Sequence, residues 1–131
     1  MECWLLTDRL GKPFVYVRPK PKDHGTGSKI EGELPKGSKV VVIEDLISTG
    51  MSSLAAVAAL KDAGADVLGM VAIFTYGFDI ARQRFAEAEV SLNTLSDYSA
   101  LVEEAGETGY ISPAAKDLLH EWRKNPSEWG L

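Results

Sequence analysis

Residues 40–50, VVVIEDLISTG, contain an apolar run, then two adjacent acids, then a turn of small and hydroxyl residues. The run at 40–43 is entirely β-branched, and such residues favour a buried β-strand. Glu44 and Asp45 follow it directly, although two neighbouring carboxylates repel each other. Two adjacent charges directly after a buried strand are unfavourable unless they serve a function at the end of that strand.

The composition of the chain is that of one folded domain with one core, spanning residues 1–131. Hydrophobic residues make up 45%, too many for a disordered chain. The sequence has no apolar stretch of the ~18 residues that cross a bilayer, and acids stand where a signal peptide would carry bases. The single cysteine, Cys3, excludes an internal disulfide framework. We therefore expect a cytoplasmic protein that does not associate with membranes, and a net charge of -5 argues against nucleic-acid binding.

Helical and strand-like segments alternate along the chain. Strands are predicted at 13–17, 39–45, 67–74 and 90–95, with a possible short extended piece around Ile30. Helices are predicted at 4–10, 52–63, 78–88, 96–106 and 112–124. Strands that are apolar on both faces and alternate with helices predict an α/β fold, a twisted parallel sheet flanked by helices on both sides.

The turn after the acids has the chemistry of a phosphate site. In parallel sheets, ligands bind beyond the carboxyl ends of the strands, where this turn leads into the helix predicted at 52–63. The first amides of a helix have no intrahelical partner, and small residues such as Ser48, Thr49 and Gly50 let an anion approach them closely. The turn lacks the GxxxxGK[ST] pattern, so it is not an ATP- or GTP-binding loop.

Glu44 and Asp45 would lie to one side of a phosphate bound at this turn. Carboxylates can accept hydrogen bonds from the vicinal hydroxyls of a ribose, and they can also hold Mg²⁺ directly or through water. A ribose that carries a 5-phosphate therefore fits both halves of the motif. The alternative, from spacing alone, is an N-cap aspartate followed by ordinary turn residues.

Residues 18–32 form a basic loop in an acidic chain. Its first twelve residues, RPKPKDHGTGSK, carry four bases and one acid. Irregular segments of this length inside a compact domain are usually lids or disordered, and Gly25 and Gly27 supply hinge-like freedom. We expect a flexible lid that leaves directly from a strand end; the alternative is a solvated linker.

These motifs resemble known enzymes. VVVIEDLISTGMSS resembles the phosphoribosyl-pyrophosphate signature of the type I phosphoribosyltransferases. VRPKPKDHGTGSKIEG is similar to the catalytic loop of the orotate phosphoribosyltransferase family, and the likeness extends to IFTYGFDIARQRFAEAEV, LSDYSALVEEA and LLHEWRKNPSEW. It spans essentially the whole chain and is closest to the bacterial form. The resemblance implies a homodimer that transfers ribose 5-phosphate from phosphoribosyl pyrophosphate to orotate, which yields orotidine 5′-monophosphate and pyrophosphate in pyrimidine biosynthesis.

The resemblance also implies roles for individual residues. Lys22 and His24 would be catalytic and, with Arg18, would bind the pyrophosphate of a neighbouring subunit's site. Ser48 would also contact orotate, and Mg²⁺ would be carried by pyrophosphate and ribose oxygens rather than by a protein metal site. The residues expected to bind phosphoribosyl pyrophosphate are Arg18, Lys22, His24, Glu44, Asp45, Leu46, Ile47, Ser48, Thr49, Gly50, Met51 and Ser52.

The chain also departs from this family. Family members usually carry a segment before the point that matches Trp4, including a hood over the base, so we expect a fold that is incomplete at its N-terminus. Some relatives place an orotate-binding arginine near residues 75–78, where TYGF has none; Arg82 and Arg84 are expected on the surface. The alternative functions are a non-catalytic regulatory module that binds phosphoribosyl pyrophosphate or nucleotides, and an inactive fragment.

Overall fold

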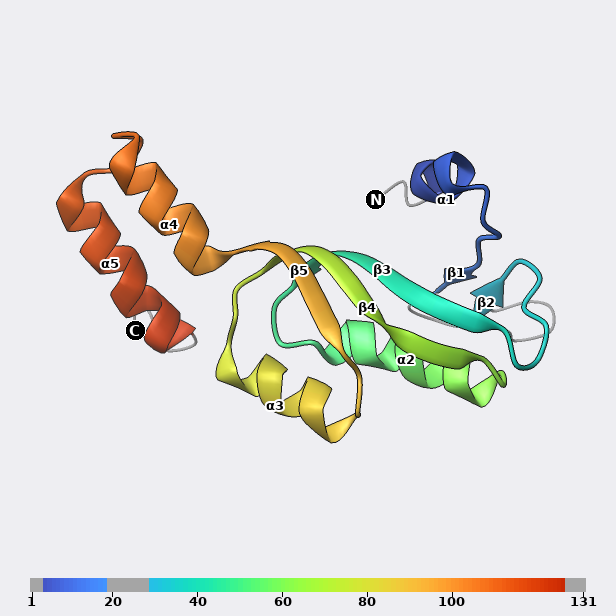
Figure 1. Cartoon of the computed structure of the whole chain (residues 1–131). Coiled ribbons are helices and arrows are strands. Elements are labelled where there is room, and N and C mark those ends of the chain that lie inside the picture. The colour runs from blue at the N-terminus through green and yellow to red at the C-terminus, as the bar shows by residue number, and fades with distance from the viewer. Residues whose placement is uncertain (1–3, 19–28, 127–131) are drawn as a thin grey trace.

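The computed structural model describes residues 4–18 and 29–126, and its centre is a three-stranded parallel sheet (Figure 1). The strands, in the order β3-β4-β5, are β3 (Lys39–Ile47), β4 (Asp66–Thr75) and β5 (Leu92–Asp97). The helices are α1 (Trp4–Leu10), α2 (Met51–Asp62), α3 (Asp79–Glu87), α4 (Tyr98–Glu107) and α5 (Pro113–Lys124). The predicted α/β class, a parallel sheet flanked by helices, is confirmed. No helix in this part of the chain has the length and apolar character needed to cross a membrane.

The hydrophobic core lies between the sheet and the helices α2 and α3. Ile47 and Met70 are fully buried, and Val57 of α2 and Phe85 of α3 pack into the same cluster. Figure 1 shows both helices beneath the same face of the sheet. On the opposite face, side chains such as Leu95 remain exposed, because successive residues of a strand point to opposite sides. Within the described residues, helices α2 and α3 cover one face of the sheet as predicted, whereas side chains on the opposite face remain exposed.

The predicted buried strand at 13–17 is wrong in length and burial. The strand β1 contains only Tyr16–Val17 and pairs antiparallel with β2 (Ile30–Glu31), separately from the main sheet. Phe14, just before this strand, and Tyr16 within it are both exposed, since a two-residue ribbon offers little surface to cover them. The extended piece predicted around Ile30 is confirmed, and its pairing closes the base of the basic loop.

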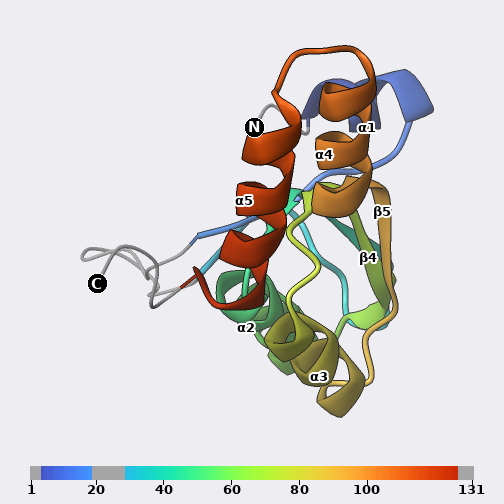
Figure 2. The same cartoon turned by 90° about the vertical axis from the view of Figure 1, so that its left-hand side faces the viewer.

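Helices α4 and α5 form a hairpin beyond the carboxyl end of the sheet (Figures 1 and 2). Asp97 caps α4 by accepting a hydrogen bond from the Ala100 amide (3.0 Å), and Ser112 caps α5 in the same way. Aromatic rings attach the hairpin to the sheet: Tyr76, at the end of β4, lies 5.7 Å from Trp122 between ring centroids. The Arg123 side chain adds hydrogen bonds to the carbonyls of Tyr76 (3.0 Å) and Gly77 (2.9 Å).

We expect Arg123→Ala to destabilise the fold, because two partly buried carbonyls lose a charged donor. The expected fall in the free energy of unfolding is about 2 kcal/mol, measured by urea denaturation. Lys124→Ala is the control, since among the described residues its amine pairs with the exposed Glu121 carboxylate (2.6 Å) and such surface pairs contribute about 0–1 kcal/mol. Equal effects of the two substitutions would show that Arg123 does not hold α5 in place.

Candidate functional site

The two acids lie inside β3, and the strand extends two residues beyond them. The predicted strand ends at Asp45, whereas β3 continues to Ile47, because Leu46 pairs with Phe74 and Ile47 with Thr75 of β4. The acids still lie within the last four residues of the strand, at its carboxyl end. The Ile47 side chain is fully buried in the core, so only its backbone could face a ligand.

Glu44 and Asp45 have different surroundings. Glu44 is half-buried, and partial burial raises the pKa of its carboxyl above the usual value. A hydrogen bond from the buried Ser53 hydroxyl acts in the opposite direction, and the neighbouring Asp45 charge adds to the rise. Asp45 is exposed, and its Oδ1 atom accepts a hydrogen bond from the Leu46 amide (2.7 Å). Glu44 is thus held by the protein, while Asp45 points its carboxylate outward. Ser53 is not among the site residues expected from the sequence.

The raised pKa of Glu44 predicts a pH-dependent term in stability. Because the carboxyl binds its proton more tightly in the folded state, its contribution is fully present below the unfolded pKa of 4.5 and is lost as pH rises through the folded-state pKa. We expect Glu44→Gln to raise the melting temperature at neutral pH and to flatten this part of the pH profile. Glu107→Gln, at an exposed position of α4, is the control. A Glu44→Gln profile that matches the wild type would contradict the assignment.

The turn at residues 48–50 joins β3 to α2 and is shaped by its glycine. Gly50 has a φ of 77°, a left-handed conformation that favours glycine. A Cβ atom at this position would lie 2.8 Å from Phe85 Cε2, so α3 packs directly against the turn. No side chain caps α2, whose first residues Met51 and Ser52 are exposed. The first amides of α2 are therefore open to an external anion.

Arg84 of α3 also contacts this turn. Its Nη1 atom donates a hydrogen bond to the Thr49 carbonyl oxygen at 3.0 Å, in a partly buried position. The expectation that Arg82 and Arg84 are both surface residues is confirmed for Arg82 and wrong for Arg84. Arg84 is half-buried because its neighbour Phe85 seats α3 against Gly50. The sequence carries no local signal for this contact, since 35 positions separate the two residues.

A cleft of about 580 Å³ lies beside the turn, between the start of α3 and the end of α5. Its volume is in the range of small-molecule sites. Thr49 of the turn contributes to its wall, so the cleft adjoins the candidate phosphate site. The cleft is lined by Thr49, Gly77, Phe78, Asp79, Ile80, Arg82, His120, Arg123, Lys124 and Pro126.

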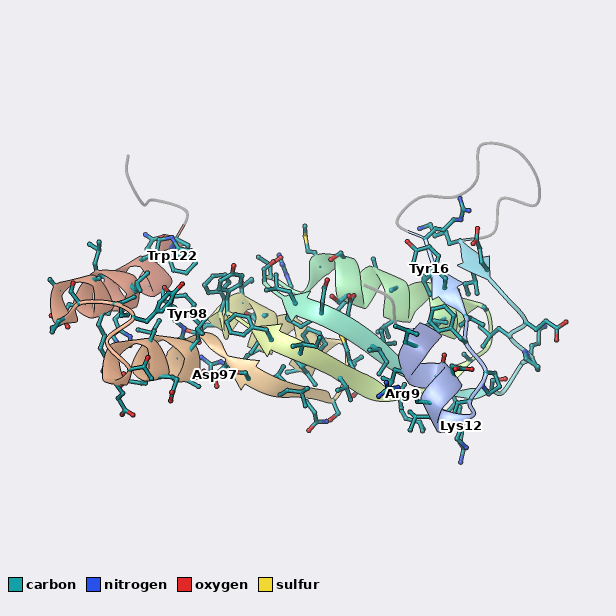
Figure 3. The ribbon with its side chains drawn as sticks, turned by 90° about the horizontal axis from the view of Figure 1, so that it is seen from above. Arg9, Lys12, Tyr16, Asp97, Tyr98 and Trp122 are labelled. Atoms are coloured by element: carbon teal, nitrogen blue, oxygen red, sulfur yellow. The ribbon has the colours of Figure 1, made fainter. Side chains whose placement is uncertain are left out.

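The basic loop is described only at its two ends, and Lys22 and His24 lie outside the described residues. The Arg18 guanidinium forms an ion pair with Glu31, and its amide donates to the Lys29 carbonyl (2.6 Å). Tyr16, in the strand just before Arg18, lies at the opposite end of the molecule from Asp97, which ends the last strand (Figure 3). Within one chain, Arg18 therefore does not lie beside the turn at the carboxyl end of β3.

No three histidine, cysteine, aspartate or glutamate side chains within residues 4–18 and 29–126 are placed to hold a metal ion together. The two carboxylates of Glu44 and Asp45 are nevertheless hard oxygen donors. Mg²⁺ prefers such oxygens and usually keeps several waters while it also binds substrate phosphates. The donor set therefore fits a Mg²⁺ ion that arrives with a phosphorylated substrate.

Comparisons with known proteins agree with this geometry. A family model described as phosphoribosyl transferase domain matches residues 5–103. An orotate phosphoribosyltransferase of Porphyromonas gingivalis is 59% identical over 127 residues, which cover 97% of this chain and 60% of that protein. Another, from Cytophaga hutchinsonii, is 52% identical over 95% of this chain and 60% of its own length. The chain thus spans about three fifths of the length of these relatives.

A solved structure gives the same result at the level of the fold. The crystal structure of orotate phosphoribosyltransferase from Aeropyrum pernix is similar with a TM-score of 0.70 and 33% sequence identity. The match covers 83% of this chain and 59% of that chain. Since the family model also matches most of the sequence, the chain belongs to the phosphoribosyl transferase domain family.

Proposed function

We propose that the chain acts as an orotate phosphoribosyltransferase in the cytoplasm. It would transfer the ribose 5-phosphate of phosphoribosyl pyrophosphate to orotate and release orotidine 5′-monophosphate and pyrophosphate. The observation that carries this proposal is the position of the uncapped amides of α2 beside Glu44 and Asp45, at one end of β3. The high identity with relatives of this name supports orotate as the acceptor.

The turn and the two acids would bind different parts of the sugar phosphate. Backbone amides and hydroxyls of residues 48–52 would donate to the 5-phosphate, which the partial positive charge of the helix terminus favours. Glu44 and Asp45 would accept hydrogen bonds from the ribose hydroxyls. Ser48, at the start of the turn, would also contact orotate. This arrangement fixes the anomeric carbon relative to the acceptor, which converts a bimolecular encounter into an oriented reaction.

The basic loop would act on the leaving group. As the bond between the anomeric carbon and the pyrophosphate oxygen breaks, positive charge develops on the sugar and negative charge on pyrophosphate. A ring nitrogen of orotate bonds to that carbon and gives up its proton to the pyrophosphate or to water. Arg18, Lys22 and His24 would stabilise the departing anion, and closure of the loop would exclude competing water. Because Arg18 is far from the turn of its own chain, we propose that the loop serves the neighbouring site of a homodimer.

Mg²⁺ would arrive with phosphoribosyl pyrophosphate and neutralise part of its charge. Glu44 and Asp45 are the residues that would hold the ion, through its water ligands or directly. Their difference in exposure gives them different tasks: the outward-facing Asp45 would meet the ion or a hydroxyl first, while Glu44 is positioned by Ser53.

An assay of orotate consumption tests the proposed function. We expect the ultraviolet absorbance of orotate to fall when phosphoribosyl pyrophosphate and Mg²⁺ are both added, and to stay constant when either is left out. Substitution of both Glu44 and Asp45 by their amides should abolish the change. Thermal stabilisation by phosphoribosyl pyrophosphate without any loss of orotate would contradict catalysis and favour the regulatory module.

A further inference from the structure

We propose that Arg84 is a positioning residue of the phosphate site: it holds the Thr49 peptide so that the Gly50 amide faces the ligand. This inference rests on the proposed function, because it assigns a task to the turn that would bind the 5-phosphate. Arg84 lies outside the residues that the sequence motif identifies, and it would not touch the substrate itself.

The planarity of the peptide bond links the orientation of the Thr49 carbonyl to that of the Gly50 amide. The carbonyl of Thr49 and the amide N–H of Gly50 belong to one peptide unit, and in a trans peptide they point in opposite directions. No peptide bond in the described chain is cis. Because the Thr49 oxygen accepts a hydrogen bond from Arg84 of α3, the Gly50 N–H must point away from that helix. It is therefore directed to the side of the turn opposite the Arg84 donor.

The preceding turn peptide is held in the same manner. The Ile47 carbonyl accepts hydrogen bonds from the Tyr76 amide (3.1 Å) and the Thr75 hydroxyl (3.3 Å), both at the end of β4. By the same geometry the Ser48 N–H points away from β4. Two carbonyls that could repel an anion are thus held by hydrogen bonds from the protein, and the two amides of the same peptides point away from those donors.

The charge of Arg84 adds to this geometry. Within residues 4–18 and 29–126, no carboxylate forms an ion pair with its guanidinium, whereas Arg82 on the same helix is paired with Asp79. A hydrogen bond from a cation to the Thr49 oxygen polarises the peptide and makes the Gly50 N–H a stronger donor. The half-buried positive charge would also act on a phosphate bound at this turn, because water screens it incompletely. The arrangement should favour a phosphate dianion over a monoanion.

The test measures binding of ribose 5-phosphate to the full chain by calorimetry across the second phosphate pKa, which is about 6. The variants are Arg84→Gln, which keeps a neutral donor, and Arg84→Lys, which keeps the charge. Arg9→Gln makes the same chemical change on the exposed helix α1, at the far end of the molecule (Figure 3), and serves as the control. The Gly50 amide proton shift, from NMR of each variant, reports the polarisation of the peptide directly.

We expect Arg84→Gln to weaken binding by roughly 10-fold above this pKa and much less below it, so that the pH dependence flattens. Arg84→Lys should restore most of the affinity, Arg9→Gln should match the wild type, and the Gly50 proton should move upfield only in Arg84→Gln. If Arg84→Gln does not fold, Arg84→Met, which removes the charge and keeps a side chain of similar length, takes its place, and its pH profile should be flattened in the same way.

The outcomes separate this inference from the proposed function. A wild-type chain that does not bind ribose 5-phosphate would overturn both. A wild-type chain that binds it, together with an Arg84→Gln variant of equal affinity and equal pH dependence, would overturn the role of Arg84 alone. A loss of affinity that is the same at every pH, with an unchanged Gly50 proton shift, would reduce Arg84 to a merely structural residue and would also overturn the inference.

Discussion

Gly50→Val is expected to abolish sugar-phosphate binding and to destabilise the fold. A β-branched residue at φ 77° costs at least 1–2 kcal/mol in backbone strain, on the order of the penalty for left-handed conformations. The added atoms would also meet Phe85, whose Cε2 lies 2.8 Å from the new Cβ, and overpacking typically costs about 1–3 kcal/mol more. Relief of this clash requires the turn to move, so we expect affinity for ribose 5-phosphate to fall by at least about 100-fold.

The matched control for this substitution is Gly37→Val. Gly37 has nearly the same φ, 79°, but nothing lies within 4 Å of its Cβ position. It should therefore show the strain penalty of about 1–2 kcal/mol in denaturant unfolding while affinity for ribose 5-phosphate stays at the wild-type value. If Gly50→Val retained wild-type affinity, the turn would not be the phosphate site.

Lys22→Ala is expected to lower turnover far more than it weakens substrate binding. A lysine that neutralises a leaving pyrophosphate acts mainly in the transition state, and loss of one such group typically costs about 3 kcal/mol, or roughly 100-fold in kcat. The basic loop that carries Lys22 is anchored at its base by the pairing of β1 with β2 and by the Arg18–Glu31 ion pair. Steady-state kinetics together with the dissociation constant of phosphoribosyl pyrophosphate would measure the two effects separately.

Lys29→Ala provides the comparison for Lys22→Ala. Lys29 is exposed at the end of the same loop, where its backbone carbonyl rather than its side chain holds the Arg18 amide. Its substitution should leave both turnover and binding within about 2-fold of the wild type. Equal losses of turnover and of affinity in Lys22→Ala would remove the leaving-group role and leave Lys22 as an ordinary binding residue.

The elements set by local chemistry were predicted well. Ser112 followed by Pro113 is a cap and first-turn pair, and α5 begins there with the Ser112 hydroxyl accepting from the Ala115 amide. Gly64 has a left-handed φ of 88° directly after α2 and its cap residue, a conformation typical of the glycine that ends a helix. These signals act over a few residues, so the sequence alone contains them.

Features that depend on distant pairing were not predicted. β3 runs on through Leu46 and Ile47 because β4 supplies partners for them almost thirty positions later. Conversely, the sequence around Phe14 predicts a buried strand, but Phe14 is exposed and lies before the two-residue strand β1. The composition of a segment indicates a preference for extended structure. The length and the burial of the resulting strand depend on which other strands and helices pack against it.

Some residues of the candidate site could likewise be predicted from the sequence, and others could not. The acids and the small turn residues could be identified from their order in the sequence, because strand, turn and helix are consecutive. Arg84 could not, since its contact with Thr49 depends on how α3 packs against α2. Ser53 lies one position beyond the last residue expected to bind the substrate, and its hydrogen bond to Glu44 depends on how the first turn of α2 packs against β3.

The most direct test of the central claim is a crystal structure of the chain with ribose 5-phosphate and Mg²⁺. We expect a phosphate held by the amides of residues 48–52 and ribose hydroxyls within hydrogen-bonding distance of Glu44 and Asp45. A ligand that occupied only another part of the molecule, or a turn that stayed empty at saturating concentration, would contradict it.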